Sequence, residues 1–346
     1  MYYFRADGNA VTGAGHLMRC LTIADELKRI SAAGEQICFV CADEDSAALV
    51  VERGYQTIVL HTDYQLMEQE LPVLAGKLQE QPMDNVILVD SYHVTEAYLE
   101  GLQEFGKVIL LDDMEKKAFP VDAVINYNAF AQEGHYKDLY QGRRTGCYVG
   151  SSYVPVRPQF LQVTYEVQDI VKNVLITTGG GDSENIAAGV LQAIWNPDWQ
   201  YHVVIGRFHP AFAAWKQWEQ QYPQIQVHHD VKNMAELMAQ CDLAVTAGGT
   251  TIYELAAIGV PFLCFSYAEN QEALTRYIGE QEIAGYCGAY HLEKDATLAR
   301  MKKLAQEAGM DLGLRKVMYQ KERTMIDGKG AERLAEMLLD AGKKGN

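Results

Sequence analysis

The sequence lacks the features that would indicate a membrane or a nucleic acid as its main partner. No apolar run reaches the roughly 18 residues of a membrane-spanning helix. Lys and Arg number 30 against 46 Asp and Glu, giving a net charge of −16, and such a field repels nucleic acids and anionic membranes. We therefore expect no membrane span and no nucleic-acid partner. A small anionic ligand is not excluded, because it responds to local backbone dipoles.

Signs of secretion are absent too. The N-terminus has no basic segment followed by an apolar run, as a signal peptide would. The seven cysteines are odd in number and widely spaced, which is typical of reduced cytoplasmic thiols rather than of a disulfide framework. Cys38 and Cys41 form a pattern seen in metal and redox sites, but they lie in a strand-like run, where side chains three apart point to opposite faces. We interpret both as core residues of a cytoplasmic protein.

Several common catalytic signatures are also missing. The sequence has no Walker A pattern, no His-Glu-x-x-His and no Gly-x-Ser-x-Gly. The adjacent His228 and His229 would point to opposite faces of a strand, so they do not indicate a metal pair. We expect neither a bound metal nor a cofactor.

What the sequence does have is the pattern of a two-domain α/β protein. Its 346 residues suggest about two domains. Short apolar, β-branched runs alternate with helical patterns in both halves, which predicts parallel sheets covered on both faces, with six strands in each half. We expect two Rossmann-like, doubly wound domains facing across a cleft, where such folds bind ligands. Prolines near residue 155 mark the boundary, and the predicted parts are an N-terminal domain (1–155), a C-terminal domain (156–290) and a helical tail (291–346).

The first glycine-containing segment, residues 5–20, follows a predicted strand. Gly13 and Gly15 let the backbone approach a ligand, and the helix predicted from His16 presents free N–H groups to an anion. A dinucleotide fingerprint would need a third glycine at Met18, so we do not expect NAD or FAD.

His16 is the candidate general base of this segment. The positive end of the helix dipole favours neutral imidazole, which can accept a proton. The alternative is a histidine that only packs against the helix or caps it.

A second glycine-containing turn lies in the C-terminal half, after another predicted strand. Its N–H and hydroxyl groups could cradle a diphosphate, and the carboxylate one turn later could bind two ribose hydroxyls. The alternative is a capping box, Thr251-x-x-Glu254, which needs no ligand. The residues of this candidate diphosphate and ribose site are Gly248, Gly249, Thr250, Thr251 and Glu254.

A third glycine-rich turn follows a strand of the same half. Gly179 and Gly180 could line the same nucleotide pocket, and Asp182 either belongs to that pocket or is the N-cap of the next helix.

Polar side chains end several further strands. They are candidates for an acid–base pair, or they are caps of loops and helices. Asn270 and Gln271 either hydrogen-bond a sugar or start the next helix. The strand-end groups of the first half are Asp90, Ser91, Tyr92, Asp112, Asp113, Asn126, Tyr127 and Asn128.

Taken in order, these motifs resemble those of the nucleotide-sugar hydrolases of pseudaminic acid biosynthesis and of related spore-coat polysaccharide biosynthesis proteins. The resemblance covers roughly residues 2–280, and the C-terminal glycine motif is shared with glycosyltransferases of the two-domain GT-B type. The motifs that carry it are Arg5-Ala-Asp7-Gly-Asn, Gly13-x-Gly15-His16-x-Met-Arg19-Cys20, Val89-Asp-Ser-Tyr92, Leu111-Asp-Asp113, Asn126-Tyr-Asn128, Gly179-Gly-Gly-Asp182 and Ala247-Gly-Gly-Thr-Thr-x-Tyr-Glu254.

The resemblance implies hydrolysis of UDP-2,4-diacetamido-2,4,6-trideoxy-β-L-altropyranose. Water would displace UDP at the anomeric carbon with inversion, without a metal. His16 would orient or deprotonate the water, and Tyr92 and Asn270 would support the substrate. The implied binding residues are Arg5, Asp7, Gly13, Gly15, Arg19, Gly179, Gly180, Gly248, Gly249, Thr250, Thr251, Glu254 and Gln271.

Two other functions fit the same motifs. A glycosyltransferase could use the same UDP-amino sugar donor with a sugar or lipid acceptor, although the acidic character of residues 30–80 weakens a lipid acceptor. A non-catalytic nucleotide-sugar binding protein would keep Glu254 and the glycines but would have no need of His16.

Overall fold

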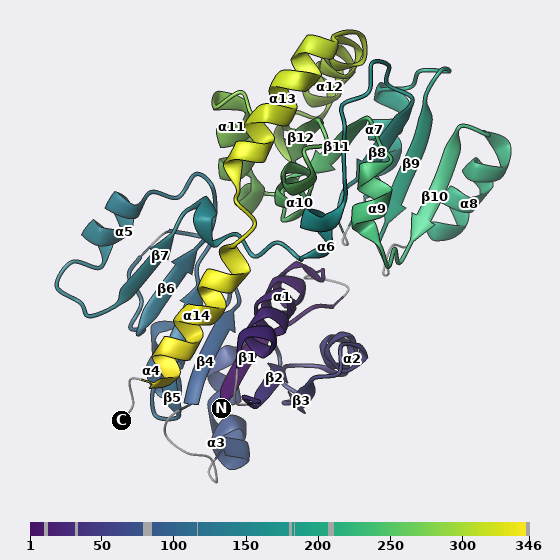
Figure 1. Cartoon of the computed structure of the whole chain (residues 1–346). Coiled ribbons are helices and arrows are strands. Elements are labelled where there is room, and N and C mark those ends of the chain that lie inside the picture. Colours follow the sequence, from purple (N-terminus) through teal and green to yellow (C-terminus); the bar gives the residue numbers. More distant parts are fainter. Residues whose placement is uncertain are drawn as a thin grey trace. The chain divides into compact units, whose positions relative to one another are not determined.

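A computed structural model describes residues 1–9, 13–31, 34–78, 85–115, 117–179, 182, 184–206 and 211–343. The chain divides into two compact units (Figure 1), each built on a parallel sheet. The N-terminal unit comprises Met1–Pro155 and Lys329–Asn346, and the C-terminal unit comprises Val156–Gly328. The fold is therefore α/β and doubly wound in both units. Within the described part of the chain, no helix is long and apolar enough to cross a membrane.

The N-terminal unit has a seven-stranded sheet in the order β3-β2-β1-β4-β5-β6-β7. The inner strands β1, β2, β4 and β6 are buried along their whole length, as expected of a parallel sheet that helices cover on both faces. Its strands are β1 (Tyr2–Ala6), β2 (Ile37–Cys41), β3 (Gln56–Val59), β4 (Asn85–Asp90), β5 (Gly106–Leu111), β6 (Ala123–Asn126) and β7 (Gly146–Val149). Its helices are α1 (Gly15–Ile30), α2 (Glu44–Glu52), η1 (Met67–Glu70), α3 (Leu71–Leu78), α4 (Glu96–Leu102), α5 (Glu133–Leu139), η2 (Ser151–Tyr153) and α14 (Gly330–Lys343).

The C-terminal unit has a six-stranded sheet in the order β10-β9-β8-β11-β12-β13. Its strands are β8 (Asn173–Thr177), β9 (Gln200–Ile205), β10 (Ile225–His229), β11 (Leu243–Ala247), β12 (Phe262–Ser266) and β13 (Gly285–Ala289). Its helices are α6 (Gln159–Gln162), α7 (Ile186–Ala193), α8 (Phe212–Gln221), α9 (Met234–Ala239), α10 (Thr251–Ile258), α11 (Glu269–Glu280), α12 (Tyr290–Met310) and α13 (Leu312–Met325).

All twelve predicted strands are present, and the structure adds β7, which the sequence pattern missed. This four-residue strand includes a glycine and is only half-buried, so it shows neither a long apolar run nor clean alternation. Cys38 and Cys41 are both buried in β2 as free thiols, which confirms that they are core residues. Burial raises the pKa of the Cys38 thiol to about 11.

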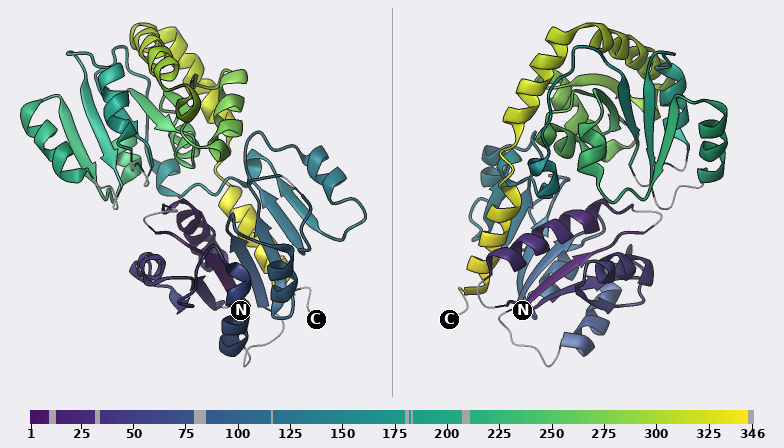
Figure 2. Two further views of the ribbon diagram at one scale, coloured as in Figure 1. Left: turned by 180° about the vertical axis from the view of Figure 1, so that it is seen from behind. Right: turned by 45° about the vertical axis from the view of Figure 1, so that its right-hand side comes forward.

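The residues from 291 onward are divided between the two units. Helix α13 joins the C-terminal unit, where the buried Arg315 donates hydrogen bonds to the carbonyls of Gln168 and Asp169. Helix α14 returns to the N-terminal unit and lies alongside α1 (Figures 1 and 2). Gly330 lets α14 begin in close contact with the backbone of Val154, because a Cβ at residue 330 would lie 2.2 Å from the carbonyl oxygen of Val154.

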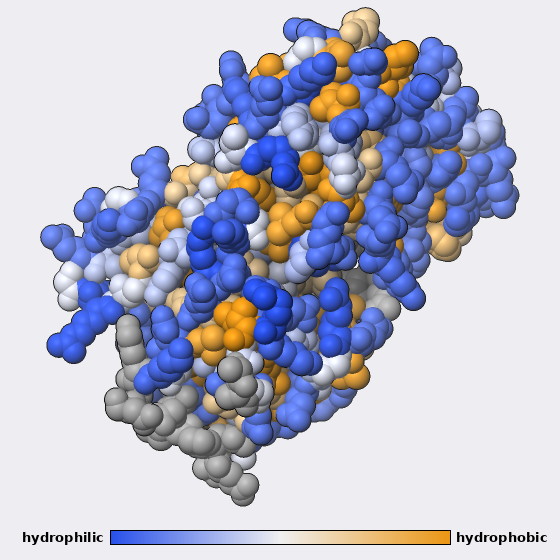
Figure 3. Space-filling model, in the orientation of Figure 1, coloured by the Kyte–Doolittle hydropathy of each residue, from blue (hydrophilic) through white to orange (hydrophobic). Residues whose placement is uncertain are grey.

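The surface carries mostly polar side chains on the face that Figure 3 shows, and hydrophobic residues occur there in small separate groups. The large apolar side chains that remain exposed belong to a few positions, and among them are Trp195 and Tyr222 of the C-terminal unit.

Candidate functional site

The candidate residues gather at one particular place in each sheet. Strand order reverses between β1 and β4 in the N-terminal unit and between β8 and β11 in the C-terminal unit. Doubly wound sheets bind ligands beyond the carboxyl ends of the strands at such a switch point. The segment that leads to His16 follows β1, and Asp90 ends β4, while Gly179 and Gly248 follow β8 and β11. Both units therefore present candidate residues where this fold places its sites.

His16 and Asp90 form a hydrogen-bonded pair at the N-terminal switch point. The His16 Nδ1 lies 2.6 Å from Asp90 Oδ1. Burial by itself would raise the pKa of Asp90, but Arg19 and His16 more than offset this and hold the pKa well below its usual range. The carboxylate is therefore ionised and accepts, so Nδ1 of His16 donates. In the neutral imidazole, Nε2 is then left as a proton acceptor. The side chain of His16 keeps 14% of its surface exposed.

Arg19 fixes the position of the Asp90 carboxylate. Its Nε and Nη2 donate to the two carboxylate oxygens of Asp90, each at 2.5 Å. Its Nη1 donates to Asp113 Oδ2 at 2.7 Å and to the hydroxyl of Tyr127 at 2.5 Å. A bidentate guanidinium–carboxylate pair is rigid as well as strong. Arg19 is predicted to bind substrate, and its buried position makes it a support for the His16–Asp90 pair.

Tyr92 lies against His16. The two rings meet edge to face, with centroids 4.6 Å apart. Tyr92 is 44% exposed, and its hydroxyl donates to Asp113 Oδ2 at 3.4 Å. The structure therefore brings together His16, Tyr92 and Arg19, three residues predicted from the sequence. It places beside them Asp90 and Asp113, two of the strand-end carboxylates that the sequence also marks as candidates.

Arg5 and Asp7 belong to a separate, closed cluster. The Arg5 guanidinium donates to both carboxylate oxygens of Glu70 and, at 2.5 Å, to Asp7 Oδ2. Asp7 Oδ1 accepts from the backbone N–H of Ala42 at 2.7 Å. Tyr98 donates to Glu70 at 3.0 Å. With Arg5 only 1% exposed and Glu70 fully buried, these side chains bond to each other and hold the first loop. A direct contact of Arg5 or Asp7 with substrate stays a prediction.

Gly13 and Gly15 lie where the loop enters α1. Gly13 has a φ of +69°, a conformation that favours glycine. A Cβ at either position would meet nothing within 4 Å, so this stretch of backbone is open. No side chain of the described residues caps the start of α1, so within that part of the chain N–H groups of its first turn are available to a ligand.

The turn between β11 and α10 is the corresponding feature of the C-terminal unit. Helix α10 begins at Thr251 with Thr250 as N-cap, and no side chain caps it. The N–H groups of these two threonines have no acceptor among the described residues. The two glycines differ. A Cβ on Gly248 would lie 2.5 Å from Thr275 Cγ2, so packing against α11 requires this glycine, whereas Gly249 faces open space.

Glu254 is not part of a capping box. Its Oε1 accepts from Arg157 Nη2 at 2.6 Å, and the N-cap is Thr250 rather than Thr251. Burial raises the pKa of Glu254, and the Arg157 guanidinium opposes that shift. Arg157 was not predicted, because in the sequence it stands in the proline-rich boundary and nothing local links it to residue 254.

Asp182, in the turn between β8 and α7, bonds to residues on both sides of that turn. Asp182 accepts from the N–H groups of Ile186 at 2.6 Å and Ala187 at 2.9 Å, and from the hydroxyl of Thr178 at 2.9 Å. The N-cap of α7 is Asn185 rather than Asp182, so the expected N-cap assignment is wrong in position. Asp182 nevertheless accepts from the first two N–H groups of the helix, as a capping side chain does. Gly179 has a φ of +85° and lies two residues after the end of β8 at Thr177. Gly180 lies outside the described residues.

Asn270 and Gln271 lie in the first turn of α11. Asn270 is exposed. Gln271 Oε1 accepts from the N–H of Tyr267 at 3.0 Å, which fixes the loop before the helix. No group of three or more His, Cys, Asp or Glu side chains in the described ranges could hold a metal ion.

The comparisons with known proteins agree with this architecture. No family model matches the sequence. The chain is 28% identical over 351 residues to the spore coat polysaccharide biosynthesis protein SpsG of Bacillus subtilis, covering 97% of this chain and 96% of that protein. It is 22% identical over 283 residues to the UDP-2,4-diacetamido-2,4,6-trideoxy-β-L-altropyranose hydrolase of Campylobacter jejuni, covering 80% of this chain and 96% of that protein.

A solved structure identifies the fold. The calicheamicin glycosyltransferase CalG4 superimposes with a TM-score of 0.69 at 14% identity, over 100% of this chain and 99% of that one. At this identity the likeness concerns the fold alone, which is the two-domain GT-B architecture. The chain is thus similar along most of its length to SpsG and to the UDP-2,4-diacetamido-2,4,6-trideoxy-β-L-altropyranose hydrolase of Campylobacter jejuni, and it has the two-domain GT-B fold.

Proposed function

We propose that this chain is a UDP-sugar enzyme of polysaccharide biosynthesis that hydrolyses UDP-2,4-diacetamido-2,4,6-trideoxy-β-L-altropyranose to UDP and the free sugar. The observation that carries the proposal is the His16–Asp90 pair, with an Nδ1 to Oδ1 distance of 2.6 Å. A binding protein needs no such pair. The relatives named above support the substrate class.

The first step of the proposed reaction is activation of water. With Nδ1 donating to Asp90, Nε2 of neutral His16 accepts a proton from the attacking water. Asp90 keeps the ring in this tautomer and stabilises the imidazolium that forms. Arg19 holds Asp90 in place through two hydrogen bonds of 2.5 Å.

The second step is departure of UDP. The water oxygen bonds to the anomeric carbon as the bond from that carbon to the phosphate oxygen breaks, and its electron pair leaves with UDP. Negative charge then grows on the diphosphate, which the free N–H groups of Thr250 and Thr251 and the start of α10 would stabilise. Attack opposite the leaving group inverts the anomeric configuration, and His16 returns its proton to solvent.

Glu254 would bind the ribose hydroxyls through the oxygen that Arg157 does not occupy. Tyr92 and Asn270 would contact the sugar. Tyr92 is exposed just after the switch-point strand β4, and Asn270 is exposed in the first turn of α11, which follows β12. No metal and no cofactor enters this proposal.

The test is release of UDP from a panel of UDP-amino sugars by the full chain, with EDTA present and no acceptor added. The panel includes the altropyranose compound, and NMR follows the anomeric configuration of the product. We expect UDP and a free, inverted sugar. His16→Ala should lose turnover and keep UDP binding, whereas His291→Ala, an exposed histidine of the C-terminal unit, should behave like the natural chain.

The same assay separates the alternatives. UDP release that appears only after a sugar or lipid acceptor is added would assign the chain to the glycosyltransferases, whose fold it shares. Tight UDP binding with no release under either condition would leave a binding protein. Unchanged turnover in His16→Ala would contradict the role of His16.

A further inference from the structure

The C-terminal unit contains a pocket that the proposed reaction does not use. Its volume is about 430 Å³, within the range of pockets that hold small molecules. It lies between the ends of α7 and α8 and the start of β10. The residues that line it are Leu191, Gln192, Trp195, Trp218, Gln221, Tyr222 and Ile225.

This pocket is at the opposite edge of the sheet from the candidate UDP site. Trp195 precedes β9 and Ile225 opens β10, so the pocket lies where strands begin. Gly179 and Gly248 follow β8 and β11, so the UDP site lies where strands end. Parallel strands share these edges, and a ligand in the pocket would therefore be separate from the nucleotide.

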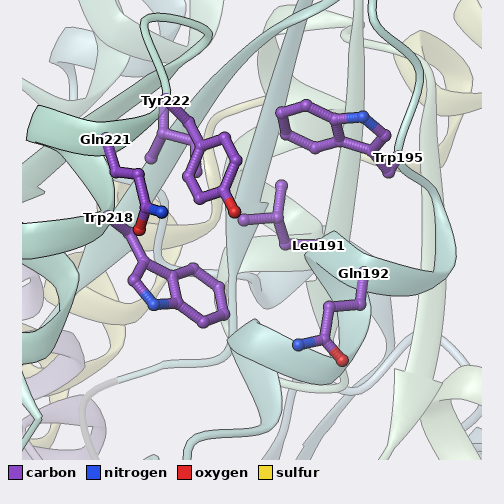
Figure 4. A pocket seen from close by; sticks show the side chains of 7 residues that line it. Leu191, Gln192, Trp195, Trp218, Gln221 and Tyr222 are labelled. Carbon is purple, nitrogen blue, oxygen red and sulfur yellow. The ribbon is translucent and has the colours of Figure 1, made fainter.

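Aromatic rings form its walls. Figure 4 shows the indoles of Trp195 and Trp218 on opposite sides, with the ring of Tyr222 between them. Trp195 stacks on Tyr201 with centroids 5.3 Å apart, and Trp218 meets Trp215 edge to face at 5.2 Å. These contacts hold the rings before any ligand arrives, which lowers the entropy cost of binding. Trp195 is 40% and Tyr222 41% exposed.

The polar side chains that line the pocket are uncharged, and their hydrogen-bonding groups remain available to a ligand. Gln192 and Gln221 carry amides that both donate and accept, and Tyr222 carries a hydroxyl. None of these three groups hydrogen-bonds to any of the described residues. No Asp, Glu, Lys or Arg lines the pocket. The lining therefore suits a neutral ligand with both apolar faces and a rim of hydroxyl or amide groups.

We propose that this pocket binds a neutral saccharide, one or two sugar rings in size, independently of UDP. A pyranose ring has C–H faces that stack on indole and phenol rings and a rim of hydroxyls that pairs with glutamine amides. A phosphate or a carboxylate would find no cation here, and a purely apolar molecule would leave the amides unpaired.

The indole N–H signals test this directly in the full chain. The experiment records a ¹⁵N spectrum of the protein with each probe in turn. The probes are N-acetylglucosamine, its β1,4-linked disaccharide, glucose and maltose, and glycerol is the control. At least one saccharide should shift the indole signals of Trp195 and Trp218. The indole N–H signals of Trp199 and Trp215 should keep their chemical shifts, because Trp199 is buried and the indole N–H of Trp215 donates to Asn185 at 2.9 Å. Adding UDP should not compete.

Matched variants complete the test. Gln192→Ala combined with Gln221→Ala should weaken saccharide binding about tenfold, and Gln220→Ala, an exposed neighbour outside the pocket, should not. Both changes lie on the surface and spare the core. Trp195→Ala should abolish the saccharide-induced shift of the Trp218 indole signal, the reporter that remains in the pocket. The proposal is overturned if no saccharide shifts Trp195 or Trp218, if the double variant binds as well as the natural chain, or if those signals respond only to protein concentration, which would indicate docking of a second copy.

Discussion

Two buried arginines of the N-terminal unit, Arg5 and Arg19, make similar ion pairs but have different roles. Each donates to two carboxylates, and each sits beside a tyrosine hydroxyl. The Arg5 cluster closes on itself, because Glu70 and Tyr98 are fully buried. The Arg19 cluster ends at His16, a ring with an exposed edge.

The difference shows what makes a buried ion pair functional. Burying two charges costs desolvation free energy, so an intact buried ion pair adds little to the free energy of unfolding. Removing one partner lowers that free energy strongly, because the other charge stays buried and unpaired. In the Arg5 cluster that rigidity holds a loop. In the Arg19 cluster the same rigidity orients a group that can exchange a proton with a ligand. Variants in the two clusters should therefore fail in different ways.

The largest effect is expected from breaking the closed cluster. Glu70→Gln removes one of the two carboxylates that pair with the buried Arg5 and leaves Asp7 as the other. We expect a loss of about 3–5 kcal/mol in the free energy of unfolding. Urea denaturation measures it, with the exposed Glu68→Gln as control. Turnover per folded molecule should be retained, and a fall in turnover at unchanged stability would instead place Glu70 in the reaction.

Breaking the open cluster should act on turnover. Asp90→Asn removes the carboxylate that fixes the His16 tautomer, and we expect kcat to fall about a hundredfold, or about 2.7 kcal/mol in the barrier. Steady-state UDP release measures kcat and KM separately. A rise in KM with kcat intact would mean that Asp90 only binds substrate.

A third buried carboxylate sharpens the comparison, because it has no arginine partner. Both carboxyl oxygens of Glu322 are buried, and burial raises the pKa of Glu322 well above its usual value, although the backbone N–H of Phe262 opposes that shift. Above the ordinary pKa near 4.3, the unfolded chain ionises while the folded chain stays protonated, so stability falls as pH rises.

Glu322→Gln should remove this penalty. We expect it to stabilise the protein by about 1–3 kcal/mol at neutral pH, with a gain that grows between pH 5 and pH 7 and vanishes near pH 4. Denaturation at several pH values measures the difference, and the exposed Glu336→Gln is the control. A gain independent of pH would show that Glu322 is ionised in the folded state.

The smallest effect is expected in the C-terminal unit. Glu254→Gln keeps the shape of the side chain but weakens its acceptor toward ribose, and we expect UDP to bind about tenfold less tightly, or about 1.4 kcal/mol. Calorimetric titration with UDP measures this. Equal binding of uridine-containing and ribose-free diphosphates by the natural chain would argue against the ribose contact.

The sequence predicted the strands and the residues at their carboxyl ends well, because both follow from local pattern and from the geometry of parallel sheets. His16, Arg19 and Tyr92 were each singled out and do lie together. The partner of His16 was harder to find. Asp90 is 74 positions away, and among several strand-end carboxylates only the strand order shows that β4 is the neighbour of β1.

Other features depend on long-range packing that no local pattern encodes. Gly248 is required by Thr275 of α11 rather than by a ligand, and Arg157 reaches Glu254 across 97 positions. The closed cluster of Arg5 looked like part of the ligand loop, because Glu70 carries no sign in the sequence of being buried.

Helix α14 has a consequence for how the protein is made. Its apolar face, which includes Leu334, Ala335 and Leu338, packs in the N-terminal unit beside α1, the helix that carries His16. A ribosome releases these residues after the whole C-terminal unit, because α14 follows that unit in the chain. The N-terminal unit, although its sheet is synthesised first, stays incomplete until the whole C-terminal unit has emerged. A nascent chain that stops before α14 would thus expose the apolar side of α1, so only molecules that include α14 carry a covered His16 helix.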